Sequence, residues 1–261
     1  MISMSATMDT SGFQRSLMAL VEIKNDAPGI VKRVAGAVVK DCVKLTPPFG
    51  KSPSSEKFED QKKVGFQAVE NDVRKVFHDI KDLQIVKERT KGSVGWNLRK
   101  AALRGDGTSV LEILKDIKID ATSFDSSPTA EHHLAVRDNR GRTNSKRGSF
   151  WVAGGIAAFT KSIQKHVGKA KHGWSTAIRT LGVKGVPNWV INNDGPSGEC
   201  LVEGAGTLKF SVTFENTVPY IQRAGRDLGI VSAAFKSTSV RLDREVEKIL
   251  AYRFKKAKAT H

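Results

Sequence analysis

The sequence predicts an α+β fold in which several helices pack on a small antiparallel β-sheet, with a long polar arm or loop. Apolar residues recur at helical spacing in several separate segments. One segment near the end alternates between apolar and polar residues, as half-buried strands do. Residues 120–148 are poor in apolar side chains, which is typical of a long exposed connection. We expect a single structural domain over residues 1–261, with an extended loop or arm at about 120–150.

Amphipathic helices are expected in the first part of the chain. A short one runs from about Phe13 to Asn25. Residues 30–43 then carry apolar side chains at i, i+3 and i+4, and Cys42 lies on this stripe. We interpret Cys42 as a small buried hydrophobe rather than a reactive thiol. The following segment, LTPPFG, ends the helix because paired prolines cannot continue it. Another apolar helical face covers residues 69–80.

The middle of the chain is less regular. Residues 82–96 give no clear pattern. Short helices are expected at 97–103 and 110–117, divided by RGDG, which we interpret as a turn rather than an adhesion motif. The segment SFWVAGG predicts a short strand.

Residues 157–181 predict one long helix with an apolar face and lysines on the outside. Gly182 follows at the position where helices often end in a glycine. Gly168 and Gly173 each cost about 1 kcal/mol relative to alanine inside a helix, so we expect the close approach of another backbone to offset that cost. Trp174 is interpreted as a packing anchor rather than a platform for stacking bases. The apolar face consists of Phe159, Ile163, Val167, Ala170, Trp174, Ala177, Ile178 and Leu181.

The clearest strand signal follows this helix. Leu208, Phe210, Val212 and Phe214 alternate with polar residues. The glycines before them allow this strand to pair back on residues 200–203 as a hairpin. A last helix is expected over about residues 232–256, and a basic tail follows.

The charge of the chain is strongly positive. It holds 43 Lys and Arg against 27 Asp and Glu, for a net charge of +16. Residues 139–193 contain ten of these bases and no carboxylate. A run of bases is usually a solvated face, but a complete absence of acid over this length suggests an anionic neighbour. The candidate contacts to DNA or an acidic partner are Arg137, Arg140, Arg142, Lys146, Arg147, Lys161, Lys165 and Lys169.

Patterns that would indicate catalysis or a cofactor are missing from the sequence. None of the common phosphate-loop, dinucleotide, nucleophile-elbow or zinc-protease motifs occurs. We interpret Glu131, His132 and His133 as part of a surface loop rather than a metal site, because adjacent side chains point apart. The two cysteines form no CxxC motif, and neither a signal peptide nor an apolar membrane-length run is visible. We therefore expect no catalytic residue, metal or cofactor.

Several segments resemble one family. HVGKAKHGWSTAIRTLGVKGVPNWV is similar to a run in the tail-completion and neck-type minor tail proteins of tailed bacteriophages and prophages. HHLAVRDNRGR resembles the arm that precedes this run, and MDTSGFQRSLMAL resembles the family's opening. FENTVPYIQRAG resembles its strand and turn. The positions that carry the resemblance are His133, Arg137, Arg140, Gly141, Arg142, Gly168, Lys169, Lys171, Gly173, Trp174, Leu181, Gly182, Pro187, Trp189, Val190, Asn216, Pro219 and Tyr220.

The resemblance implies a structural virion protein. Its role would be a head–tail connector, neck or tail-completion (tail terminator) ring subunit, made in the host cytoplasm and built into the particle. The implied partners are further copies in a homo-oligomeric ring, other neck, portal or tail-tube proteins, and packaged DNA, with no membrane. The alternative is a basic protein that binds nucleic acid independently of sequence. An enzyme is a third class, for which the sequence offers no motif.

Overall fold

The computed structural model describes residues 5–7, 27–48, 57–137, 143, 150–204, 210–219, 221, 229–240 and 247. The chain divides into two compact units. The first unit comprises Met1–Val64 and His166–His261, and the second unit is Gly65–Lys165. Both contain helices and a small sheet, so the predicted α+β class is confirmed. The single domain expected over 1–261 stays a prediction, because such a division does not show whether the units unfold together.

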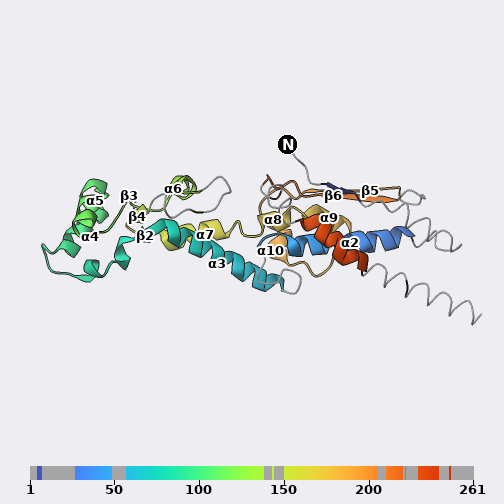
Figure 1. Cartoon of the computed structure of the whole chain (residues 1–261), viewed down its shortest axis with the longest axis horizontal. Helices are drawn as coiled ribbons and strands as arrows, with labels where there is room; N and C mark the ends of the chain where they lie inside the picture. Colours follow the sequence, from blue (N-terminus) through green and yellow to red (C-terminus); the bar gives the residue numbers. More distant parts are fainter. Residues whose placement is uncertain are drawn as a thin grey trace, which may run out of the picture. The chain divides into compact units, whose positions relative to one another are not determined.

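The first unit contains an antiparallel sheet in the order β1–β6–β5. These strands are Ser5–Thr7 (β1), Glu199–Glu203 (β5) and Ser211–Glu215 (β6). Cys200 lies opposite Phe214 in the register, which confirms the predicted hairpin. Phe210, Val212 and Phe214 are buried, as their alternation predicts. Helices α2 and α9 pack against this sheet (Figure 1).

Helix α2, Ala27–Leu45, carries the predicted apolar stripe into the core of the first unit. Cys42 is fully buried within the stripe, as predicted. Burial, together with the nearby charge of Asp41, raises the pKa of the Cys42 thiol far above its ordinary value, so the thiol is unreactive. The helix ends where expected, since Thr46 donates both its backbone N–H and its hydroxyl to the Cys42 carbonyl and two prolines follow.

The long helix predicted over residues 157–181 is wrong. The segment forms three shorter helices: Ile156–Gln164 (α7), Lys169–His172 (α8) and Ser175–Thr180 (α9). The first break occurs at Gly168, whose φ of 102° is incompatible with helix. Gly182, with φ of 65°, ends α9 as predicted.

Both interrupting glycines are sites of close approach, as predicted. A Cβ on Gly168 would lie 2.8 Å from the ring of Trp189, which belongs to helix α10, Asn188–Ile191. A Cβ on Gly173 would lie 2.0 Å from Oδ1 of Asn216. The Asn216 side chain fills that space, donating to the Ala170 carbonyl at 2.8 Å and accepting from the backbone N–H of Val218 at 3.1 Å. The neighbours are therefore side chains rather than the backbone we expected.

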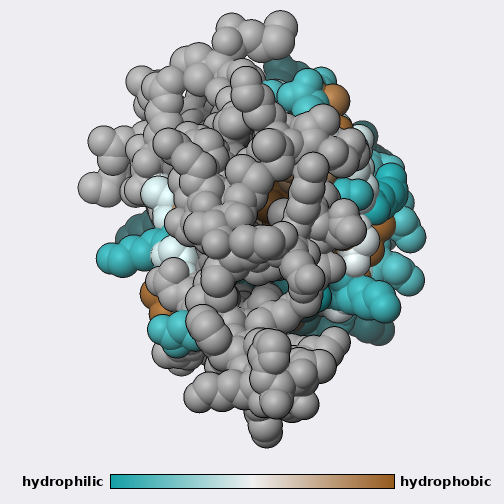
Figure 2. All heavy atoms as spheres, turned by 90° about the vertical axis from the view of Figure 1, so that its right-hand side faces the viewer, coloured by the Kyte–Doolittle hydropathy of each residue, from teal (hydrophilic) through white to brown (hydrophobic). Residues whose placement is uncertain are grey.

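Trp174 anchors the core of the first unit, which confirms the packing interpretation. Its side chain is fully buried, and its ring meets the Phe214 ring edge-on at 6.1 Å. Its Nε1–H donates to Oγ1 of Thr46 at 2.9 Å, so the one polar atom of the indole is satisfied. On the face in Figure 2, the described side chains that reach the surface are mainly hydrophilic, and hydrophobic ones form small separate patches.

The two outermost predicted helices are described in part or not at all. Residues 230–240 are helical, and Ile230 and Ala234 from this segment join the core of the first unit. The rest of the helix expected over 232–256, apart from residue 247, lies outside the described residues, as does the helix expected at about 13–25.

The second unit contains a parallel sheet, which the sequence did not predict. Its strands, in the order β2–β4–β3, are Phe77–Asp79 (β2), Ser123–Asp125 (β3) and Phe150–Val152 (β4). Strand β4 is the one predicted from SFWVAGG. Helix α3, Phe58–Val76, ends before β2, so the helical face predicted over residues 69–80 is wrong beyond residue 76.

Two short helices follow one another in the second unit. Helix α4, Val94–Arg104, and helix α5, Gly107–Asp116, match the predicted pair. RGDG is the turn between them, as predicted. Gly105 ends α4 with a left-handed φ of 71°, and the Asp106 side chain caps α5 by accepting from the backbone N–H of Ser109.

The polar arm expected at about 120–150 is described only in part. It contains β3 and a short helix, α6, Ala130–Ala135. Residues 138–142 and 144–149 lie outside the described residues.

Candidate functional site

The eight cations predicted to contact DNA or an acidic partner are distributed over both units. Lys161 and Lys165 are exposed on and just after α7 in the second unit. Lys169 is half-buried at the start of α8 in the first unit. Arg140, Arg142, Lys146 and Arg147 lie outside the described residues. Of the four described members, Arg137, Lys161 and Lys165 belong to the second unit and Lys169 to the first.

Arg137 belongs to a charge cluster around Asp72. Nη2 of Arg137 and Nε2 of His133 each lie 3.0 Å from Oδ2 of Asp72, and the Thr143 hydroxyl donates to Oδ1. Partial burial works to raise the pKa of Asp72, but the hydrogen bonds from His133 and Thr143 and the charge of Arg137 together lower it. Asp72 thus compensates the charge of Arg137 within the second unit, so Arg137 would attract an external anion less strongly.

The surface loop predicted at residues 131–133 is wrong. These residues lie in α6, where the Thr129 hydroxyl accepts from the backbone N–H of His132 and begins the helix. His133 is 4% exposed and reaches Asp72. His132 stacks on Phe150, with 4.3 Å between ring centroids. The adjacent imidazoles have different acidic partners, Asp125 for His132 and Asp72 for His133.

Lys171 is a further correction, because the sequence analysis placed the lysines of this segment on the outside. Its side chain is fully buried in the first unit. Nζ donates to the carbonyls of Val43 at 2.7 Å and Lys44 at 3.4 Å, and also to the Thr46 carbonyl. These carbonyls lie at and just after the C-terminal end of α2, where helices favour a cation. Burial lowers the pKa of the Lys171 ammonium to about 7. Lys171 is thus a helix cap rather than a contact residue.

The clearest candidate site was not predicted, and it lies in the second unit. Two short 3₁₀ helices, Ile80–Asp82 (η2) and Gln84–Lys87 (η3), follow β2 and lead toward α4. Gly95 allows α4 to pack directly on this segment, because a Cβ there would lie 1.8 Å from the Ile85 carbonyl oxygen. One turn later, Nη2 of Arg99 donates to the carbonyl of Val86, and to that of Glu88 at 3.3 Å.

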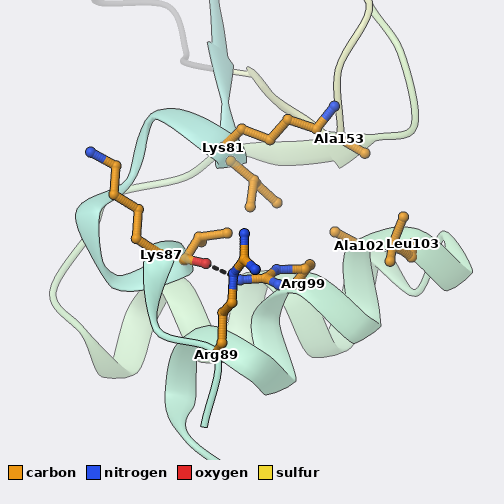
Figure 3. Close-up of a pocket in the computed structure, with 9 residues that line it drawn as sticks. Lys81, Lys87, Arg89, Arg99, Ala102, Leu103 and Ala153 are labelled. Carbon is orange, nitrogen blue, oxygen red and sulfur yellow. Dashed lines mark hydrogen bonds between the residues drawn. The ribbon is translucent and has the colours of Figure 1, made fainter. Parts of the chain in front are cut away.

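These segments line an open pocket of about 380 Å³, which we call the arginine pocket. Figure 3 shows Arg89 and Arg99 reaching it from different segments, while the ammonium ends of Lys81 and Lys87 point away from the two guanidinium groups. Of the described residues that line the pocket, none is acidic. The apolar lining residues are Ile80, Val86, Ala102, Leu103 and Ala153.

The chemistry of the arginine pocket is that of an anion receptor. Two guanidinium groups offer planar sets of N–H donors that match the oxygens of a phosphate or carboxylate. Two lysines at its edge add positive charge. The described lining residues include no carboxylate, imidazole or thiol.

Sequence reasoning missed this pocket because residues 82–96 show no periodicity. A signal was present, since Lys87, Arg89 and Lys91 alternate just before Gly95. That pattern alone does not distinguish a solvated segment from a pocket wall.

Among the described residues, no three or more His, Cys, Asp or Glu side chains group in a way that could hold a metal ion. Within the same residues, no helix combines the length and apolarity needed to cross a membrane. Comparison with protein-family models, with curated proteins and with solved structures finds no match to this chain.

Proposed function

We propose that this chain is a structural subunit of a tailed bacteriophage particle, a neck, head–tail connector or tail-completion subunit. The proposal rests on the resemblance of residues 166–190 to that family. One structural observation supports it: the residues that carry the resemblance pack on one another. Gly168 contacts Trp189, and Nδ1 of His172 lies 2.9 Å from the carbonyl oxygen of Val190.

The same holds for the more distant segment of the resemblance. Asn216 fills the space left by Gly173, and Trp174 is buried against Phe214. These residues therefore contribute to a packed core rather than to a surface for a substrate. A packed core of this kind is expected of an assembly subunit, because the subunit must keep its shape while its surface adapts to neighbouring subunits.

The proposed assembly is a ring of identical subunits, as the resemblance implies. Head-to-tail contacts between identical subunits give such a ring when the rotation between neighbours closes. Six or twelve copies suit the axis of a tail, as the family resemblance implies. The ring would contact neck, portal or tail-tube proteins, and its basic residues would face packaged DNA or an acidic partner. In this proposal the protein is made in the host cytoplasm and ends in the virion.

Electron microscopy of particles made with and without the gene tests the proposal. Without the gene, we expect filled heads and tails that fail to join, or tails of uncontrolled length. Supplying the chain in trans should restore joined particles, and labelled antibody should bind at the head–tail junction or the tail end. Normal infectious particles in its absence would refute a structural role, as would a chain found only outside the virion.

A second candidate function is sequence-independent binding of nucleic acid. It is favoured by the acid-free run of residues 139–193, of which Lys161 and Lys165 are exposed. Affinity for unrelated duplexes across a salt series tests it. Backbone contacts predict equal affinity for all sequences, falling steeply as salt rises. A strong preference for one sequence that persists at high salt would contradict this reading, because it requires contacts to base edges.

A further inference from the structure

We propose that the arginine pocket of the second unit binds a nucleoside phosphate, either as a free nucleotide or as one unit of a nucleic-acid strand. The site is independent of the assembly role proposed above. It combines two features that such a ligand requires: guanidinium groups for the phosphate and an apolar wall beside them for the base.

The phosphate part of the inference rests on charge. Arg89 and Arg99 both line the pocket, and no described lining residue is acidic. An oxyanion bound between the two guanidinium groups would offset their mutual repulsion. Lys81 and Lys87 also line the pocket, but their ammonium ends point away from the two guanidinium groups. A phosphate, with up to two negative charges, compensates the two guanidinium groups better than a carboxylate with one.

Arg99 is held in place before any ligand arrives. Its Nη2 donates to the Val86 and Glu88 carbonyls, which fixes the guanidinium plane. Within the described residues, Nε and Nη1 of Arg99 make no hydrogen bond, so their N–H groups remain for an oxyanion. A donor whose orientation is already fixed loses less entropy on binding. Gly95 is the residue that allows this geometry, because it brings α4 against η3.

The nucleoside part of the inference rests on space and apolar surface. The pocket volume of about 380 Å³ falls in the range of small-molecule sites, and a phosphate alone would fill only part of it. Leu103 lines the pocket and, at 79%, is the most exposed of the large apolar side chains that the structure describes. A planar base would cover Leu103 and the neighbouring Ala102, removing apolar surface from water. An arginine plane can stack on the same base.

Titration calorimetry on the full chain tests the inference with three probes: inorganic phosphate, thymidine 5′-monophosphate and a short oligothymidylate. We expect thymidine monophosphate to bind more tightly than phosphate. Arg89→Met should weaken its binding by about tenfold or more, because charged hydrogen bonds are lost. Leu103→Ser should weaken thymidine monophosphate and leave phosphate unchanged. Both residues are exposed, so both variants should fold.

Lys115→Met is the matched control, since Lys115 is an exposed lysine on α5 that does not line the pocket. It should bind all three probes like the wild type. Binding of the oligothymidylate alone, weakened by Arg89→Met but not by Lys115→Met, would assign the ligand to a strand. Equal affinity for phosphate and thymidine monophosphate would overturn the nucleoside part. No binding of any probe, or binding that Arg89→Met leaves unchanged, would overturn the whole inference.

Discussion

The buried ammonium of Lys171 predicts a specific dependence of stability on pH. Lys171 is fully buried, and its Nζ donates to the Val43, Lys44 and Thr46 carbonyls. In the unfolded chain this lysine keeps its proton up to a pKa near 10.5, whereas burial lowers the folded value to about 7. Between these values the unfolded state holds more protons than the folded state. The free energy of unfolding therefore rises with pH across this window, and this contribution is lost as pH falls through about 7.

The size of the effect follows from the same two pKa values. From about pH 7 to about pH 8.5, the linkage amounts to about 1.5 kcal/mol of added stability. The three carbonyls favour the ammonium form and reduce this figure, so it is an upper value. Cys42 acts in the opposite direction, because its raised pKa lowers stability once the unfolded thiol ionises near pH 9.0. Measurements below that pH isolate the contribution of Lys171.

The assay is urea unfolding of wild type, Lys171→Met and Lys184→Met at several pH values in this range. Lys184 is an exposed lysine in the same unit, so its removal should leave the pH slope unchanged. Lys171→Met should lose the slope. It leaves buried carbonyls without a donor at a cost of about 1–3 kcal/mol, offset by removal of the buried charge. A wild-type slope that persists in Lys171→Met would refute the assignment of the titration to this residue.

Two further substitutions test the packing of each unit. Trp174→Ala should destabilise the first unit by about 3–5 kcal/mol and give unfolded or insoluble protein, whereas exposed Lys165→Ala should melt like wild type; a well-folded Trp174→Ala that had lost nucleic-acid binding would contradict the assignment of its faces. Gly95→Ala should cost about 1–3 kcal/mol, because the new Cβ would lie 1.8 Å from the Ile85 oxygen, and should abolish binding in the arginine pocket. Gly29→Ala, in α2 with nothing within 4 Å, is the control and should stabilise the chain by up to about 1 kcal/mol in thermal melts. Equal melting temperatures for these two glycine variants would show that α4 does not pack closely on η3.

Elements with a local signal were predicted well. The stripe over residues 30–43 became α2, because periodic burial against one core is what selects an amphipathic helix. The alternation ending at Phe214 became β6, and RGDG became a turn, since glycine and a capping aspartate act within a few residues. Trp174 was correctly placed in a core, because it faces the core even though the predicted helix is divided into shorter ones.

Features decided by distant segments were not predicted. Gly168 adopts its left-handed conformation beside Trp189, and hydrophobic periodicity carries no information about that choice. Strand β2 follows α3 directly, so Phe77 continues a helical pattern while it pairs with β4. The three-residue strands β2 and β3 show too little alternation to be recognised, whereas the apolar segment SFWVAGG did predict β4. The arginine pocket depends on the same kind of contact, since Arg99 reaches carbonyls that precede its own helix.

The charge run of residues 139–193 shows why basic residues must be sorted by structure before they support a function. Lys171 belongs to this run, yet its side chain is fully buried and its ammonium group donates to carbonyls at the C-terminal end of α2. By contrast, Arg89 and Arg99 lie outside this run, yet they share a pocket with no acidic lining residue among those described. Two guanidinium groups that line one pocket are a stronger indication of an anionic ligand than a longer run of bases, because a run of bases is usually a solvated face and its members can also be used in packing.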